Sequence, residues 1–165
     1  MDSSGSFFID RGCAERAVRM SLPMITEAMK DSEICGSGFL YIVVMDPALN
    51  PSNATFRDAI LYEHAIGDRD RWDADYGEFA RAKARVAWRT GMDGHMVQEL
   101  RPYLLTAKDT VLWGSVVVDG IVVSASGAQP WYDEAFAGAV AMCLRALAKA
   151  GIEKERGKSL FLPVR

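Results

Sequence analysis

Residues 116–123 read Val-Val-Val-Asp-Gly-Ile-Val-Val, and this stretch is the strongest local signal in the sequence. An Asp-Gly pair between two β-branched runs predicts a two-residue β-hairpin with a type I′ turn at Asp119-Gly120. Both arms are apolar at every position rather than at alternate ones, which is typical of strands covered on both faces. The pattern therefore predicts two central strands of a sheet that has helices on each side.

The segment after the hairpin predicts a loop and then a long helix. Residues 124–130 read Ser-Ala-Ser-Gly-Ala-Gln-Pro, and a proline is well placed at the first position of a helix. Asp133 and Glu134 follow in the first turn, where negative charge is favourable. We expect Gly151 to end this helix and the charged tail over 153–158 to fray.

The first fifty residues predict a helix and then a strand. Apolar residues recur at helical spacing over 14–29, and Pro23 is expected to kink or split this helix. Two glycines, Gly36 and Gly38, are expected to end it. Residues 39–45 are apolar throughout, which predicts a second strand that is covered on both faces.

The middle of the chain is more ambiguous. Residues 56–66 fit either a strand or a helix that starts at Asn53. We choose a strand over Ala59–His64, because a short loop then pairs it with the preceding strand. The next helix is predicted between a cap at Asp73 or Asp75 and a stop at Gly91. A short helix is expected around 95–100, before Pro102.

This order of elements predicts an α/β (α+β) fold in which helices cover both faces of a central antiparallel sheet. With 165 residues, half of them hydrophobic and a quarter charged, the chain is expected to form one domain over 1–165, with its core over about 11–151. The net charge of −3 argues against a nucleic-acid-binding surface and a polybasic membrane anchor. The longest apolar run, 39–45, is too short to span a membrane. No export signal is visible, so a cytoplasmic location is expected.

Metal and nucleotide sites are not predicted. Three widely spaced cysteines and two histidines provide neither a disulfide framework nor a set of metal ligands. The sequence contains no phosphate-binding loop and no nucleophile elbow.

The loop before the last helix is the main candidate binding site. Free backbone N–H groups and the positive end of a helix favour an anion such as a carboxylate, although an ordinary helix cap explains the same residues. Lys83 lies at the edge of an apolar stripe, where it either contacts such a ligand or extends along its own helix. His64 is either a general base, an iron ligand or a hydrogen-bonded, half-buried histidine. The candidate ligand-binding residues are Lys83, His64, Ser126, Gly127, Ala128 and Trp131.

Other polar residues are expected to have structural roles. Arg81, Arg85 and Arg89 recur at intervals of four on one side of a helix, which is typical of a solvated face, with Glu78 close enough to pair with Arg81. His95 follows Asp-Gly and is expected on a surface loop or at a helix cap.

The C-terminal half resembles a known family. Lys83-Ala84, Asp119-Gly120, Ser126-Gly127-Ala128 and Pro130 with Asp133-Glu134 resemble the haem-binding and haem-degrading family that includes GlcG, HbpS and the C-terminal domain of PduO. The resemblance covers roughly 39–151. It implies a profilin-like three-layer α/β/α sandwich, a homo-oligomer that is at least a dimer, and haem as a possible cofactor.

Three functions follow as hypotheses. The first is a small-ligand-binding accessory protein that holds haem or another carboxylate-bearing molecule at the loop, Lys83 and the strand that carries His64. The second is an enzyme of small-molecule catabolism with Glu63 or His64 as general base. The third is an oligomeric scaffold without a ligand.

Overall fold

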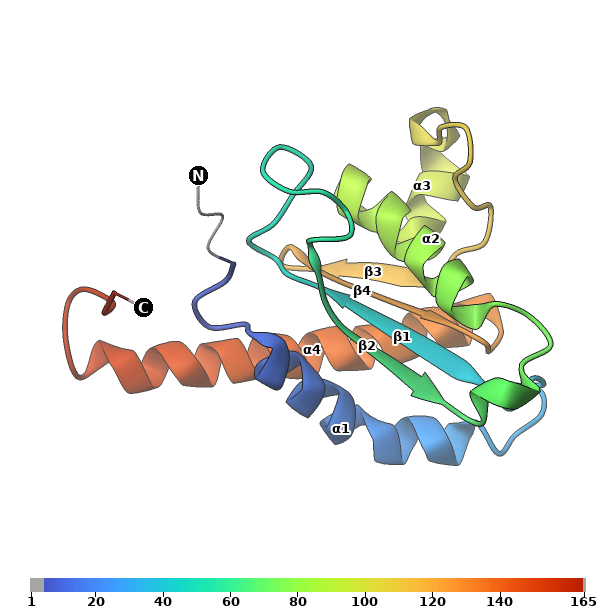
Figure 1. Cartoon of the computed structure of the whole chain (residues 1–165), viewed down its shortest axis with the longest axis horizontal. Coiled ribbons are helices and arrows are strands. Elements are labelled where there is room, and N and C mark those ends of the chain that lie inside the picture. The colour runs from blue at the N-terminus through green and yellow to red at the C-terminus, as the bar shows by residue number, and fades with distance from the viewer. Residues whose placement is uncertain (1–4, 165) are drawn as a thin grey trace.

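The computed structural model describes residues 5–164 and has a four-stranded antiparallel sheet at its centre (Figure 1). The strand order is β2-β1-β4-β3, so β1 and β4 are the inner strands. The first two strands pair from Leu40 opposite Ile66 to Met45 opposite Ile60, with one register shift near Met45. The strands span Leu40–Met45 (β1), Ile60–Ile66 (β2), Ser115–Val118 (β3) and Ile121–Ser126 (β4).

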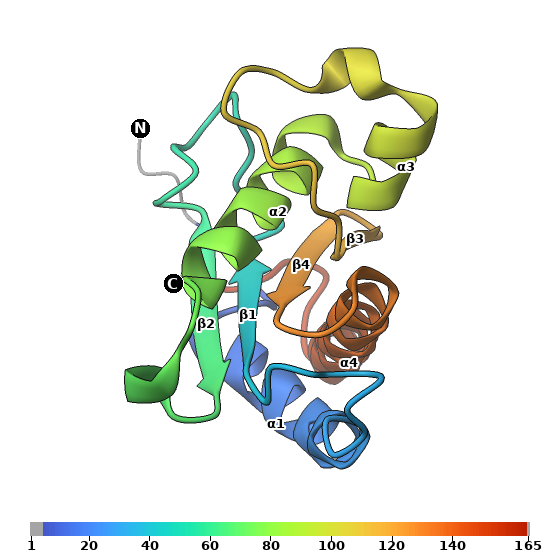
Figure 2. The same ribbon diagram turned by 90° about the vertical axis from the view of Figure 1, so that its right-hand side faces the viewer.

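Helices cover both faces of this sheet. Figure 2 shows α2 on one face and the pair α1 and α4 on the other. The order of elements and the layers confirm the predicted α+β fold with a central sheet. The helices are α1 (Arg11–Ala28), α2 (Tyr76–Thr90), α3 (Gly94–Leu100) and α4 (Pro130–Arg156), with short 3₁₀ turns at Arg69–Arg71 and Pro102–Leu104.

Each face of the sheet has its own hydrophobic core. Alternate residues of β1 divide between the two cores: Ile42 and Val44 pack with α1 and α4, whereas Tyr41 and Val43 pack with α2. All six residues of β1 and all six of β4 are buried. The unbroken apolar runs in the sequence therefore reflect burial on two sides, as expected.

One strand of the hairpin lies at an edge, which corrects the expectation of two central strands. β4 is an inner strand, but β3 pairs only with β4, and its last two residues, Val117 and Val118, are half-buried. The segment between α2 and β3 folds as α3 and a 3₁₀ turn, so among residues 5–164 no fifth strand lies beside β3.

Two helix ends also differ from the expectation. α4 continues past Gly151 to Arg156, and Gly151 packs under the ring of Phe8, which would lie 3.0 Å from an added Cβ. α1 is not split at Pro23, and it ends at Ala28, before the glycines expected to stop it. The strand expected over 59–64 is present as β2, shifted by one or two residues.

By length and composition alone, α4 is apolar enough to cross a membrane. In the structure its buried stripe packs on the sheet and on α1, with Phe136, Val140 and Leu144 in the core. These contacts bury one stripe of α4, and 28% of its apolar window is buried in the structure.

The two hairpin valines that face α2 test the difference between the strands. Val117 and Val122 are direct neighbours across the hairpin, but only Val122 lies on an inner strand. We expect Val122→Asp to lower the free energy of unfolding by about 3 kcal/mol or more, because it buries an unpaired charge. Val117→Asp should cost roughly half as much or less, since a half-buried carboxylate keeps part of its hydration. Equal losses in urea denaturation would contradict the assigned strand order.

Candidate functional site

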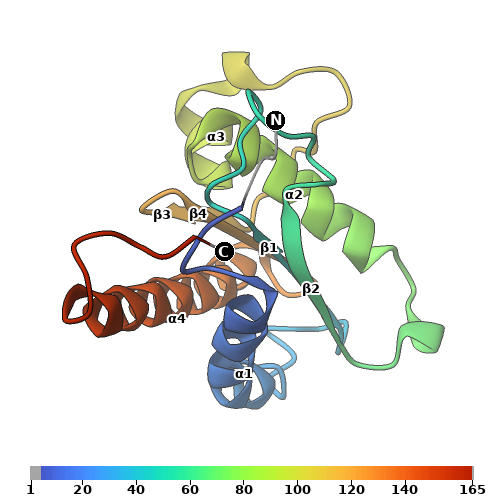
Figure 3. The same ribbon diagram turned by 60° about the vertical axis from the view of Figure 1, so that its left-hand side comes forward.

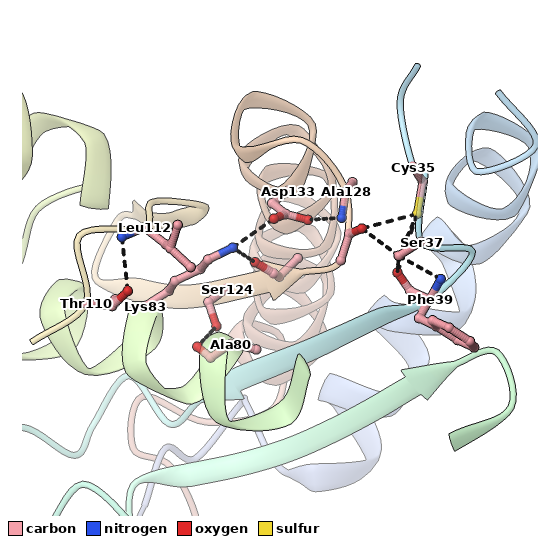
Figure 4. Close-up of polar contacts among 12 residues, drawn as sticks. Cys35, Ser37, Phe39, Ala80, Lys83, Thr110, Leu112, Ser124, Ala128 and Asp133 are labelled. Atoms are coloured by element: carbon pink, nitrogen blue, oxygen red, sulfur yellow. Dashed lines mark hydrogen bonds and ion pairs between the residues drawn. The ribbon is translucent and has the colours of Figure 1, made fainter. Parts of the chain in front are cut away.

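A buried ion pair lies where the sequence predicted a ligand. The Nζ atom of Lys83, on α2, is 2.8 Å from Oδ2 of Asp133, on the first turn of α4 (Figure 4). The Lys83 side chain is 3% exposed and the Asp133 side chain 1%. Lys83 also donates a hydrogen bond to the carbonyl oxygen of Ala125, at 3.1 Å. Lys83 is therefore a buried link from α2 to α4, and neither a free cation nor a side chain extended along its own helix.

The backbone N–H and C=O groups of the loop before α4 also form hydrogen bonds within the protein. The N–H of Ala128 donates to Oδ1 of Asp133 at 2.9 Å, and the N–H of Gln129 donates to the carbonyl of Ile34. The Ser37 hydroxyl donates to the carbonyl of Gly127 at 2.7 Å. The carboxylate of Asp133 thus takes the position that was predicted for the carboxylate of a ligand.

Gly127 is required by the close approach of this loop to the sheet. Its φ is +141°, and an added Cβ would lie 2.0 Å from the carbonyl oxygen of Phe39. A larger residue would push the loop away from the start of β1. The Ser-Gly-Ala motif is therefore explained by packing and capping.

Burial dominates the electrostatics of Asp133. Desolvation raises the pKa of its carboxyl to about 6, although Lys83 and the N–H groups of Ala128 and Gly127 favour the charged form. The ionisation of the Asp133 carboxyl therefore depends on its partner, Lys83.

Of the remaining predicted site residues, Ser126 and Trp131 flank the loop beside this pair, whereas His64 lies apart from it. Ser126 is buried in β4, whereas Trp131 is 57% exposed on α4. His64 lies on β2, which is separated from β4 by β1. Its Nδ1 is 3.2 Å from the hydroxyl oxygen of Tyr62, and burial lowers its pKa. The structure brings Lys83 to the 124–130 loop as predicted, but it leaves His64 elsewhere.

A groove of about 770 Å³ runs along the outer side of β2. Figure 3 shows β2 at the outside of the sheet, between α1 and α2. Tyr41, Phe56 and Tyr62 line the groove together with residues 60–61 of β2. Its charged residues are four arginines and two glutamates: Arg11, Arg57, Arg81, Arg85, Glu63 and Glu78.

In the part of the chain that the structure describes, only one of the groove arginines has a carboxylate partner. Arg81 pairs with Glu63 at 2.6 Å and donates to the Tyr41 hydroxyl at 3.1 Å. Arg85 lies over the ring of Phe56, and Arg11 lies over the ring of Tyr62. Within residues 5–164, Arg11, Arg57 and Arg85 form no ion pair, which leaves the groove with a net positive charge.

The prediction that the α2 arginines form a solvated face is therefore wrong in detail. Arg81 pairs with Glu63 rather than with Glu78, and Arg89 pairs with Asp109. Sequence reasoning missed the groove because its cations come from α1, α2 and the loop before β2. The spacing of the α2 arginines was visible, but nothing in the sequence indicated that Arg11 or Arg57 would lie beside them.

A second pair of titratable groups lies at the start of α4. His95 Nδ1 is 2.6 Å from Oε2 of Glu134, and the imidazole packs near the ring of Trp113. Burial raises the pKa of Glu134, and the contact with His95 partly offsets this rise. His95 is thus a contact between α3 and α4 rather than a free surface residue.

Comparison with known proteins gives no family assignment: no protein-family model and no curated protein matches the chain. The family resemblance in the sequence therefore remains a prediction.

The ion pair can be tested by substituting its members singly and together. Lys83→Met leaves Asp133 buried without its cation, and Asp133→Asn leaves Lys83 without its anion. At pH 7.5 we expect each change to lower the free energy of unfolding by about 3–5 kcal/mol. The double variant should lose less than the sum, because no unpaired charge remains and the asparagine oxygen still accepts from Ala128. Additive losses in urea denaturation would argue against direct coupling.

Proposed function

We propose that the chain is a ligand-binding protein whose groove beside β2 holds a molecule with carboxylate or phosphate groups. The observation that carries this proposal is the set of three arginines, Arg11, Arg57 and Arg85, that line one groove without a carboxylate partner among residues 5–164. The whole chain carries a net charge of −3, so a local excess of cations is not a consequence of its composition. The ligand class is the one expected from the sequence, but the place is different.

The surroundings of these arginines favour anion binding. Arg85 lies 4.7 Å from the centre of the Phe56 ring, and Arg11 lies 5.3 Å from the centre of the Tyr62 ring. Stacking on a ring limits the motion of a guanidinium, so less conformational entropy is lost when an anion binds. A guanidinium also offers paired N–H donors that match the two oxygens of a carboxylate or phosphate.

The groove does not fit haem. A porphyrin needs apolar walls and an axial ligand to its iron. The phenols of Tyr41 and Tyr62 are of a type that can ligate haem iron, but most of the other lining side chains are charged, so the groove lacks apolar walls. His64 lies on the neighbouring part of β2, where its Nδ1 contacts Tyr62.

The geometry gives less support to an enzyme with Glu63 or His64 as general base, because each side chain has a partner within the protein. Successive residues of a strand point to opposite faces of the sheet. Glu63 pairs with Arg81 on the α2 side, whereas His64 contacts Tyr62 on the α1 side. We therefore propose binding rather than general-base catalysis by either residue.

Self-association is a second candidate function, favoured by exposed apolar side chains on the face opposite α2. Met20 and Met24 of α1 are about half exposed, as are Trp131 and Met142 of α4. The outward side of α4 also carries small residues such as Ala135 and Ala146. Such a surface suits a second copy, because pairing would remove apolar area from water.

The anion site can be tested by calorimetric titration with citrate at low ionic strength. We expect binding that weakens as salt is added, since exposed charges are screened. Arg57→Gln and Arg85→Gln should each weaken it by about 1–3 kcal/mol, as expected for a charge-assisted hydrogen bond. Arg101→Gln is the matched control, because Arg101 is exposed and lies outside the groove. Equal affinity in all three variants would contradict the assigned groove.

Self-association is tested separately by light scattering. We expect a mass of at least twice 18.1 kDa at micromolar concentration. Met24→Glu combined with Met142→Glu should shift the protein toward a monomer without unfolding it, because both side chains are half exposed. A wild-type mass near 18.1 kDa would rule out this candidate.

A further inference from the structure

The strand beside the groove has an unpaired edge. β2 is the last strand of the sheet and pairs only with β1. Among residues 5–164, no hydrogen bond outside the sheet reaches the backbone of residues 61–66. An edge strand presents alternate N–H and C=O groups outward, and these groups can pair with another extended chain.

A bulge limits where such pairing can occur. Tyr62 lies opposite Val44 and Ile60 lies opposite Met45, so Leu61 has no partner on β1. Bulges twist an edge and interrupt regular pairing. The regular part is therefore Tyr62–Ile66, five residues that span roughly 17 Å at the usual rise of a strand.

Positive charge lies on both sides of the beginning of this edge, at Tyr62 and Glu63. Arg11 comes from α1, which covers one face of the sheet, and Arg85 comes from α2, which covers the other. Arg57 lies in the loop that leads into β2. The side chains of an added strand would alternate between the two faces. Neighbouring acidic residues on that strand would therefore meet cations on both sides.

We propose that β2 takes up an extended acidic peptide segment as an additional strand, with its carboxylates on Arg11, Arg57 and Arg85. The inference rests on the proposed function, since it identifies the molecule whose anionic groups bind in the groove as an acidic peptide. A second copy of this chain is a poorer occupant of the same edge. It would bring another groove with four arginines and two glutamates against the first, and like charges oppose such pairing.

The test uses the full chain and two capped octapeptides in which pairs of glutamates alternate with single valines. One peptide has free backbone N–H groups, and its twin is N-methylated at every backbone amide. Both carry the same charge, but only the first can donate hydrogen bonds to β2. We expect the N-methylated twin to bind roughly tenfold more weakly or worse, because several backbone hydrogen bonds are lost. Hydrogen exchange at Tyr62–Ile66 should slow with the first peptide and stay unchanged with glutarate.

The failures of the two proposals are distinguishable. If both peptides and glutarate bind alike and Arg57→Gln weakens all three, the groove binds anions but the added strand is wrong. If none of them binds, the anion groove and the added strand are both wrong. Slow exchange at Tyr62–Ile66 without any peptide, in a protein that scatters as a dimer, would assign the edge to a second copy. Tighter binding of a single-stranded oligonucleotide than of the peptide would also overturn the inference.

Discussion

The buried ion pair between Lys83 and Asp133 fixes the arrangement of the layers. It joins α2, on one face of the sheet, to the first turn of α4, on the other, and it lies beside the end of β4. Removing two charges from water is costly, so each group depends on the other and on the hydrogen bonds around them. Gly114 is part of the same constraint, because an added Cβ there would lie 2.7 Å from Cβ of Asp133 and 3.1 Å from Nζ of Lys83.

The ion pair also occupies the place where the sequence predicted a ligand. A helix N-terminus with a nearby lysine is attractive for an anion, but here Asp133 already accepts from both Lys83 and Ala128. Within residues 5–164, the arginines that lack such a partner lie toward the other edge of the sheet, beside β2. A buried charge is paired within the protein, as Asp133 is, whereas an exposed cation is hydrated and needs no protein partner; the proposed groove depends on cations of the second kind.

The local structure could be predicted from the sequence more fully than the site. The Asp-Gly hairpin, the helix that begins at Pro130 and the left-handed stop at Gly91 depend on neighbouring residues, and all three were predicted. The partner of Lys83 lies 50 positions away, and that of Arg81 lies 18 positions away. Such pairs depend on strand order, which no local pattern specifies. The contact of Gly151 with Phe8, which lies near the other end of the chain, could not be predicted for the same reason.

The choice between the two anion sites can be measured directly by following backbone amide resonances during a titration with citrate. We expect the largest shifts at residues 57–63, at residues 78–85 of α2 and at Arg11, which surround the groove. The amides of Gly127, Ala128 and Gln129 should move little, because protein groups already occupy this loop. Largest shifts at residues 127–129, with the β2 groove unchanged, would contradict this expectation.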